Sequence, residues 1–380
     1  MQIVDLDNLV RVDLVTNPAQ ADRADLKTLL VLSPAWAGEV KEFFSTAEVD
    51  ADGGLGAADK ARLRAALVQR GVASVKIGGA GASETAAQTL ARLREEDDGW
   101  IAIAVSVIAA EDEVVTAPHV AHDYVDDLSD LLETAKEKLL VVDAWGMVDD
   151  DGDLVTDGDF SDLALLEGRE FTTVFAIGPD LSVENPLPNY ARQSHGIQVA
   201  ALVLGLDADR RSAAWSWQQL EQSTPSVLPT PSFPANQTWL NVYGRNRGID
   251  ITARGVTTSG HPVHGTIAAL WFKFRAGERI TEAMARYTQV NGKIPYDNTG
   301  ISLIAATVSG LLRDAERIGH ALEGSTAMNA PAVDEISPSD YTNGHYPMRA
   351  GFRVQGSIVS VELQGIVSMT FEAAEIGLEG

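Results

Sequence analysis

Residues 239–251 read Trp-Leu-Asn-Val-Tyr-Gly-Arg-Asn-Arg-Gly-Ile-Asp-Ile, and residues 255–263 read Gly-Val-Thr-Thr-Ser-Gly-His-Pro-Val. The first stretch predicts a strand, and the second, with glycines at both ends of a short polar run, predicts a turn. Three helical stretches are expected after the turn, and the last two are separated by Gly-Lys-Ile-Pro-Tyr-Asp-Asn-Thr-Gly-Ile at residues 292–301. The block therefore predicts an α+β unit in the C-terminal part of the chain.

The helix expected at residues 298–322 has the clearest periodicity of the chain. Its apolar side chains recur at i, i+3, i+4 and i+7, which is the spacing of one helix face. They are Ile301, Ile304, Ala305, Val308, Leu311, Leu312, Ala315 and Ile318. Asp297 or Asn298 can cap this helix, because a short side-chain oxygen accepts hydrogen bonds from the first unpaired backbone N–H groups.

Strands and helices alternate in the N-terminal half, from Leu26 onward. Short apolar segments rich in Val, Ile and Leu are typical of buried strands, and the alternation predicts an α/β layered sheet. The expected strands are Thr28–Leu32, Val72–Ile77, Trp100–Val105, Leu139–Asp143 and Thr172–Ile177. The expected helices are Ala57–Gln69, Ser83–Glu95, His119–Lys138 and about Tyr190–Leu204.

A proline-rich segment divides the chain. Residues 225–234 hold four prolines, and proline at that density prevents regular structure. We therefore predict an α/β domain at 21–224, a linker at 225–235 and a second domain at 236–354.

Strand patterns without a local partner occupy both ends, and predict an N-terminal arm at 1–20 and a C-terminal arm at 355–380. In the first arm, Val10, Val12 and Leu14 alternate with Arg11 and Asp13, before a break at Asn17-Pro18. In the second, the alternating apolar residues are Val359, Val361, Leu363, Val367 and Met369. We expect these strands to pair with a distant segment or with another chain.

The charge of the chain is strongly negative and unevenly distributed. The net charge is −25, and phosphate backbones and anionic lipid surfaces repel such a chain, which disfavours nucleic acid and membranes as direct partners. Residues 239–322 instead carry ten basic and six acidic residues, a net charge of +4. This asymmetry predicts a surface for an acidic partner, or a helix face with solvated arginines. The absence of cysteine excludes disulfides, thiolate nucleophiles and cysteine-held metals.

The candidate chemical motifs are weak. Gly78-Gly-Ala-Gly-Ala-Ser83 lies between an expected strand and helix, but Glu84 replaces the third glycine of a dinucleotide site. Residues 48–59 have the spacing of a calcium loop with unsuitable residues at both ends, and an acidic surface turn is favoured. His119 and His122 can share one helix face but have no third metal ligand. We therefore predict no catalytic, cofactor-binding or metal-binding residues.

The order of these segments resembles contractile phage tail-sheath proteins, and the resemblance covers most of the chain. It rests on Asn241-Val-Tyr243, the Gly255–Gly260 turn and the Lys293-Ile-Pro-Tyr296 linker with Gly300-Ile301. Ala213–Leu220, Val75–Gly79 and Asp98–Ile103 extend it. The stretch between Asp143 and Phe171 departs from the family, because it leaves room for only a small surface domain where many sheaths carry a larger one.

The resemblance implies a structural subunit, not an enzyme, with no cofactor. Sheath subunits stack as rings around an inner tube, exchange terminal strands with their neighbours and contract to drive the tube through the host envelope. The implied partners are further copies of the chain, the tail tube protein, and baseplate and tail-terminator proteins. The implied location is the virion, assembled in the host bacterial cytoplasm. Tube contact is expected from helical arginines, namely Arg275, Arg279, Arg286, Arg313 and Arg317. The alternative is a soluble α/β nucleotide-binding protein or enzyme that uses the Gly78–Ser83 turn.

Overall fold

A computed structural model describes residues 25–81, 83–108, 119–145, 161–178, 190–225 and 238–357 of the 380-residue chain. Within these ranges, an eight-stranded sheet has the order β2-β3-β1-β4-β5-β6-β7-β8. Six parallel strands form its centre, while β2 and β8 pair antiparallel at the two edges. In chain order, the strands are β1 (Leu29–Ser33), β2 (Lys41–Phe43), β3 (Val75–Gly79), β4 (Ala102–Ile108), β5 (Leu139–Trp145), β6 (Thr172–Ile177), β7 (Leu240–Asn246) and β8 (Ile249–Ala253).

Helices cover both faces of the sheet, so the central strands are buried on both sides, as parallel strands require. The helices α1 (Thr46–Ala51), α2 (Ala57–Leu67), α5 (Tyr190–Gln193) and α6 (His195–Gly205) belong to one face. The helices α3 (Ala86–Glu96) and α4 (His122–Ala135), with the 3₁₀ turn η1 (Ser161–Leu166), belong to the other. Two apolar cores result, one on each face. The layered α/β architecture predicted from the alternation is confirmed.

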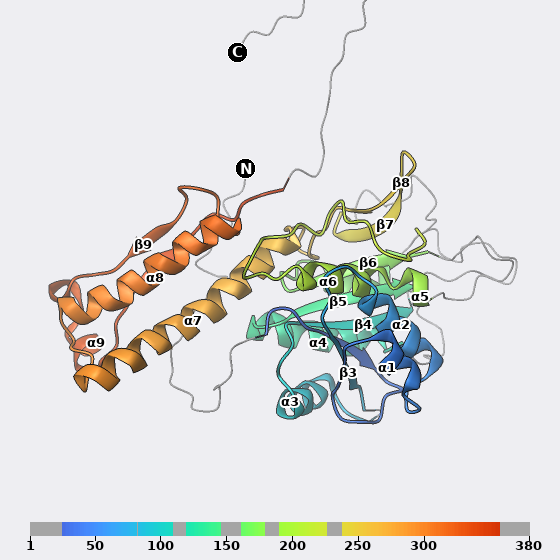
Figure 1. The fold of residues 1–380 in the computed structure, drawn as a ribbon, viewed down its shortest axis with the longest axis horizontal. Coiled ribbons are helices and arrows are strands. Elements are labelled where there is room, and N and C mark those ends of the chain that lie inside the picture. Colours follow the sequence, from blue (N-terminus) through green and yellow to red (C-terminus); the bar gives the residue numbers. More distant parts are fainter. Residues whose placement is uncertain are drawn as a thin grey trace, which may run out of the picture.

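A long helical hairpin extends from the sheet (Figure 1). It consists of α7 (Val263–Asn291) and α8 (Asn298–Ile318). The segment that follows α8 runs beside it and contains β9 (Ala327–Asn329), η2 (Val333–Glu335), α9 (Pro338–Thr342) and β10 (Arg349–Gly351), with β9 and β10 paired antiparallel. The α+β C-terminal part predicted from the sequence is confirmed, with β7 and β8 belonging to the large sheet.

The expectation of three helical stretches in this block is wrong. The chain forms one uninterrupted helix of 29 residues before the linker, with Gly277 inside it. Gly292, at φ +80°, ends α7, and Gly319, at φ +88°, ends α8, whose last residue is Ile318 and not the expected Leu322. Asp297 caps α8 as predicted, because its Oδ1 accepts hydrogen bonds from the backbone N–H groups of residues 299 and 300 at 2.8 and 3.2 Å.

The buried side chain of Asn241 joins β7 to its neighbours. Its Nδ2 donates to the Val174 carbonyl oxygen at 3.1 Å and to that of Val256 at 2.7 Å, and its Oδ1 accepts from the Gly255 and Val256 N–H groups. Gly255 has φ +74°, and a Cβ there would lie 2.5 Å from the Ser216 nitrogen, so this position requires glycine. The asparagine and the turn glycine of the sequence block therefore fix β7 and the start of α7 against the sheet.

The sheet continues past the proline-rich segment, since β7 pairs with β6 at Val174 and Phe175. The division of the chain into two domains around residues 225–235 stays a prediction. The predicted arm residues Val10, Val12, Leu14, Val359, Val361, Leu363, Val367 and Met369 lie outside the described residues.

Candidate assembly site on the helical hairpin

The hairpin is anchored at one end and exposed at the other. All buried residues of α7 lie between Val263 and Ile280, and none lies in its last eleven residues. In α8 the buried residues are likewise concentrated from Val308 to Ile318, where they join the core that covers one face of the sheet. The outer half of the hairpin therefore lies outside the core of the subunit, and Val290 near its end is 83% exposed.

An ion-pair network holds the hairpin to the sheet domain. The Arg275 side chain is 4% exposed, and its Nε and Nη2 donate to the two carboxylate oxygens of Asp209 at 2.7 and 2.8 Å. Its Nη1 donates to Glu278, one turn further along α7. Trp271 Nε1 also donates to Asp209, at 2.9 Å. Asp209 belongs to the loop after α6, so this network ties α7 to the sheet domain.

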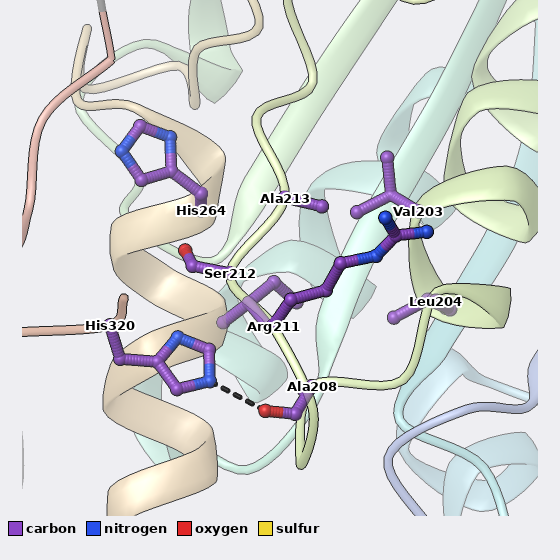
Figure 2. A pocket seen from close by; sticks show the side chains of 9 residues that line it. Val203, Leu204, Ala208, Arg211, Ser212, Ala213, His264 and His320 are labelled. Carbon is purple, nitrogen blue, oxygen red and sulfur yellow. Dashed lines mark hydrogen bonds between the residues drawn. The ribbon is translucent and has the colours of Figure 1, made fainter. Parts of the chain in front are cut away.

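A small cavity of about 10 Å³ lies beside this network, between the end of α6, the loop at residues 208–213 and the hairpin (Figure 2). His320 lies at its edge, stacks on Trp271 with ring centroids 4.9 Å apart, and donates from Nε2 to the Ala208 carbonyl oxygen at 2.7 Å. The volume corresponds to about one water molecule. The cavity is therefore a packing gap at a joint and too small for an organic ligand.

Two buried histidines hold the chain where it leaves the hairpin. His264 donates from Nε2 to the Gln355 carbonyl oxygen at 3.1 Å, and the His320 carbonyl oxygen accepts from the Gln355 N–H at 3.0 Å. Burial lowers the pKa of both imidazoles. The root of the C-terminal segment is therefore fixed to α7 and to the end of α8.

The arginines predicted to contact a tube occupy different environments. Arg275 is inside the protein and is used for the anchor, so its guanidinium does not face a partner, and that prediction is corrected. Arg279 and Arg317 share Asp314, at 2.7 and 3.1 Å, and Arg286 pairs within α7. Arg313 is exposed on α8. These four remain candidates for a contact, which stays a prediction.

The glycine-rich turn after β3 is filled by the protein itself. A Cβ at Gly78 would lie 2.6 Å from the Leu93 side chain, and one at Gly79 would overlap the Trp36 carbonyl oxygen. The Glu84 carboxylate accepts hydrogen bonds from Nε and Nη2 of Arg92 at 2.9 and 3.0 Å, and this ion pair lowers the Glu84 pKa to about 2. A carboxylate therefore occupies the region near the helix N-terminus where a dinucleotide phosphate would lie.

The residues of the other weak motifs do not form a common site. In the segment with calcium-loop spacing, Asp50 pairs with Arg64, Asp52 with Lys41, and Asp59 is buried beside Arg62. His119 is buried against Tyr190, with Nε2 2.9 Å from the hydroxyl oxygen. No group of three metal-binding side chains occurs in the part of the chain that the structure describes. Among the same residues, no helix combines the length and apolar content needed to cross a bilayer.

Sequence reasoning missed Asp209 and His320. Both act through partners far along the chain, since Asp209 binds Arg275 and His320 binds Ala208, 112 residues away. Neither lies in a local motif, so no sequence signal indicated them.

No family model and no curated protein matches the chain by sequence. Solved structures of similar fold do match it over most of its length. A chain of the anti-feeding prophage baseplate aligns with 13% identity and a TM-score of 0.61, covering 95% of this chain and 98% of that chain. A chain of the contracted sheath complex of the extracellular contractile injection system PVC aligns with 12% identity and a TM-score of 0.62, covering 92% and 93%. The contracted helical sheath of the anti-feeding prophage gives 13% identity, a TM-score of 0.58 and coverage of 96% and 98%.

At this identity the likeness concerns the fold, and it extends over the sheet domain and the hairpin alike. The resemblance predicted from the sequence is confirmed at that level: the chain has the fold of chains from the sheath and baseplate assemblies of contractile injection systems.

Proposed function

We propose that this chain is the structural subunit of a contractile sheath, which polymerises around an inner tube and contracts to drive the tube through an envelope. The observation that carries the proposal is the match to chains of two contracted sheath assemblies over more than nine-tenths of this chain. Further copies of this chain, a tube protein, and baseplate and terminator proteins are the partners. The chain acts in the virion or injection particle after assembly in the bacterial cytoplasm, and it acts as a scaffold without turnover.

The β9–β10 ribbon supports strand exchange as the means of assembly. Residues 320–322 pair with 353–355, through the Ala321–Val354 bridge and the Leu322 N–H to the Arg353 carbonyl oxygen. Together with β9 and β10 they form an antiparallel ribbon beside α8 that lies outside the eight-stranded sheet. A two-stranded ribbon is marginally stable in water. Its outer edges therefore suit a strand donated by a neighbouring copy, through backbone hydrogen bonds.

The position of the ribbon also connects it to the second arm. β10 ends at Gly351, and four residues later His264 and His320 hold Gln355, where the predicted C-terminal arm begins. A subunit can thus accept a strand on its ribbon and donate one from the same region. Tube contact is assigned to Arg279, Arg286, Arg313 and Arg317 on the hairpin.

Sedimentation velocity of the full chain and of a variant without residues 1–20 tests this function. The full chain should form particles of many subunits. The truncated chain should sediment as a monomer with unchanged circular dichroism, because we predict that residues 1–20 pair with a neighbouring copy. A full chain that remains a small oligomer would count against the proposal, and so would a truncated chain that still polymerises.

A further inference from the structure

A buried polar layer crosses the core at the carboxyl end of the parallel strands. On the face covered by α2 and α6, β1, β4 and β5 carry Val31, Ala104 and Val141 in the apolar core. Two residues further along the same strands and on the same face stand Ser33, Ser106 and Asp143, all fully buried. Ser106 and Asp143 are register partners. The layer is therefore contiguous, and it lies where the strand order reverses around β1, the place where open α/β sheets bind ligands.

Arg62 of α2 reaches this layer with half of its guanidinium unpaired. The side chain is fully buried, and its Nη1 donates to the Leu32 carbonyl oxygen at 3.2 Å and lies 3.4 Å from Asp59 Oδ1. Its Nε and Nη2 are buried and have no hydrogen-bond partner among the described residues. An unpaired buried donor costs the free energy of desolvation, so such a group in a native protein requires an explanation.

Three other arginines of the same protein show which group the Nε and Nη2 edge of a guanidinium binds. Arg92, Arg245 and Arg275 each place Nε and Nη2 on the two oxygens of one carboxylate, at 2.7 to 3.0 Å. This bidentate geometry is the preferred arginine contact to carboxylate and phosphate groups. The edge of Arg62 presents the same two donors without the oxyanion.

Further unpaired donors lie around Arg62. Ser106 Oγ and Trp145 Nε1 are buried without a partner, and so is His119 Nδ1, which carries the proton when the Tyr190 hydroxyl donates to Nε2. Trp145 follows Asp143 by two residues on β5. Its ring centroid lies 6.3 Å from that of His119 and 5.0 Å from that of Tyr190. The half-buried Tyr190 is the most accessible member of this group.

The hydrogen bonding and the protonation of the Asp143 carboxyl group suit this environment. Its Oδ1 accepts from the Gly196 N–H at 2.7 Å, and its Oδ2 is buried without a partner. Burial raises the Asp143 pKa to about 7. The protonated carboxyl group can donate from Oδ2, whereas the ionised group would repel an anion. Asp59 is already engaged by Ser33 and by Arg62 Nη1.

We propose that this polar layer is a binding site for a small oxyanion, a carboxylate or a tetrahedral phosphate-like group, held on the Nε and Nη2 edge of Arg62. Ser106, Trp145 and the Asp143 carboxyl group supply further donors. The site is separate from the assembly surfaces and does not depend on the sheath function.

Thermal unfolding of the full chain tests the proposal, with sulfate and acetate as the probes and chloride at equal ionic strength as the reference. Millimolar sulfate or acetate should raise Tm by several degrees and reach saturation, because a ligand that binds the native state stabilises it. The anion with the larger effect identifies the tetrahedral or the planar class. If neither anion raises Tm beyond chloride, the layer holds water alone and the proposal is overturned.

Matched variants locate the effect. Arg62→Lys keeps the charge but loses the bidentate edge, and it should abolish the saturable shift. Arg245→Lys makes the same exchange on the exposed β7–β8 hairpin and should keep the shift. An equal response in all three proteins would mean general exclusion of the salt from protein surfaces and would also overturn the proposal.

If Arg62→Lys fails to fold, the pH dependence of the stabilisation of the wild type by sulfate tests the proposal instead. Sulfate stays ionised between pH 6 and pH 8, and burial keeps the pKa of His119 near 4 and raises that of Tyr190, so both rings stay neutral. The stabilisation by sulfate should fall at least severalfold as Asp143 loses its proton. A shift that does not change with pH would contradict the site.

Discussion

Replacing Arg275 by alanine should loosen the joint between the hairpin and the sheet domain. The substitution removes two hydrogen bonds to Asp209 and the ion pair with Glu278, and leaves a space beside Trp271. Removal of one partner from a buried ion pair costs about 3–5 kcal/mol of unfolding free energy. The side chains of Asp209 and Glu278 are about a quarter exposed, so water can solvate part of the charge that loses its partner. We therefore expect a loss of about 2–3 kcal/mol.

Urea unfolding of the unpolymerised subunit, followed by circular dichroism, measures this loss. Arg286→Ala is the matched control, because it removes the same side chain from the same helix in an exposed i,i+4 pair with Glu282. Such a pair contributes about 0.3–0.5 kcal/mol. Equal losses in the two variants would refute the view that the Arg275 network anchors the hairpin.

Four further outcomes are expected. Reversing Arg313 and Arg317 to Glu should weaken co-assembly with the tube but leave sheath-only polymers intact, and salt should reproduce part of the effect in a pelleting assay, because exposed pairs are screened. Met328→Pro in β9 should abolish polymerisation without lowering Tm by more than a few degrees, since proline removes a ladder donor from an exposed ribbon. Burial lowers the His195 pKa to about 4, so its contribution to stability is complete above about pH 6.5 and is lost as pH falls towards 4, and His195→Gln should reduce this acid sensitivity in urea titrations. Burial raises the Asp143 pKa to about 7, so ionisation of this carboxyl group destabilises the native state as pH rises from about 4 to 7. In urea titrations, the unfolding free energy of Asp143→Asn should therefore rise by roughly 2–4 kcal/mol relative to that of the wild type between pH 5 and pH 8.

Local patterns in the sequence predicted the elements of this fold well. The periodicity of residues 301–318 and the cap at Asp297 define α8, and the apolar runs define the central strands, because these signals depend on neighbours within one or two turns. The end of α8 was missed, since Gly319 in a left-handed conformation stops the helix before the apolar pattern ends.

Features that depend on distant pairing could not be predicted in this way. The strand at 240–246 joins β6 across the proline-rich segment, and Asn241 secures it through contacts with residues up to 68 positions away. Arg275 carries the same charge as Arg286 and lies on the same helix, but Asp209, 66 residues earlier, turns it into an internal anchor. Arg62 lies within the helix expected at Ala57–Gln69, but its full burial could not be predicted, because it depends on the packing of α2 against the sheet.

Electron cryomicroscopy of the polymer that the purified full chain forms, with helical reconstruction at a resolution that separates strands, tests most directly whether the chain assembles by strand exchange. We predict stacked rings in which a strand from a neighbouring copy lies along the β9–β10 ribbon and the outer half of the α7–α8 hairpin contacts another chain. A discrete small oligomer, or a polymer whose subunits meet without strand pairing at that ribbon, would contradict the account.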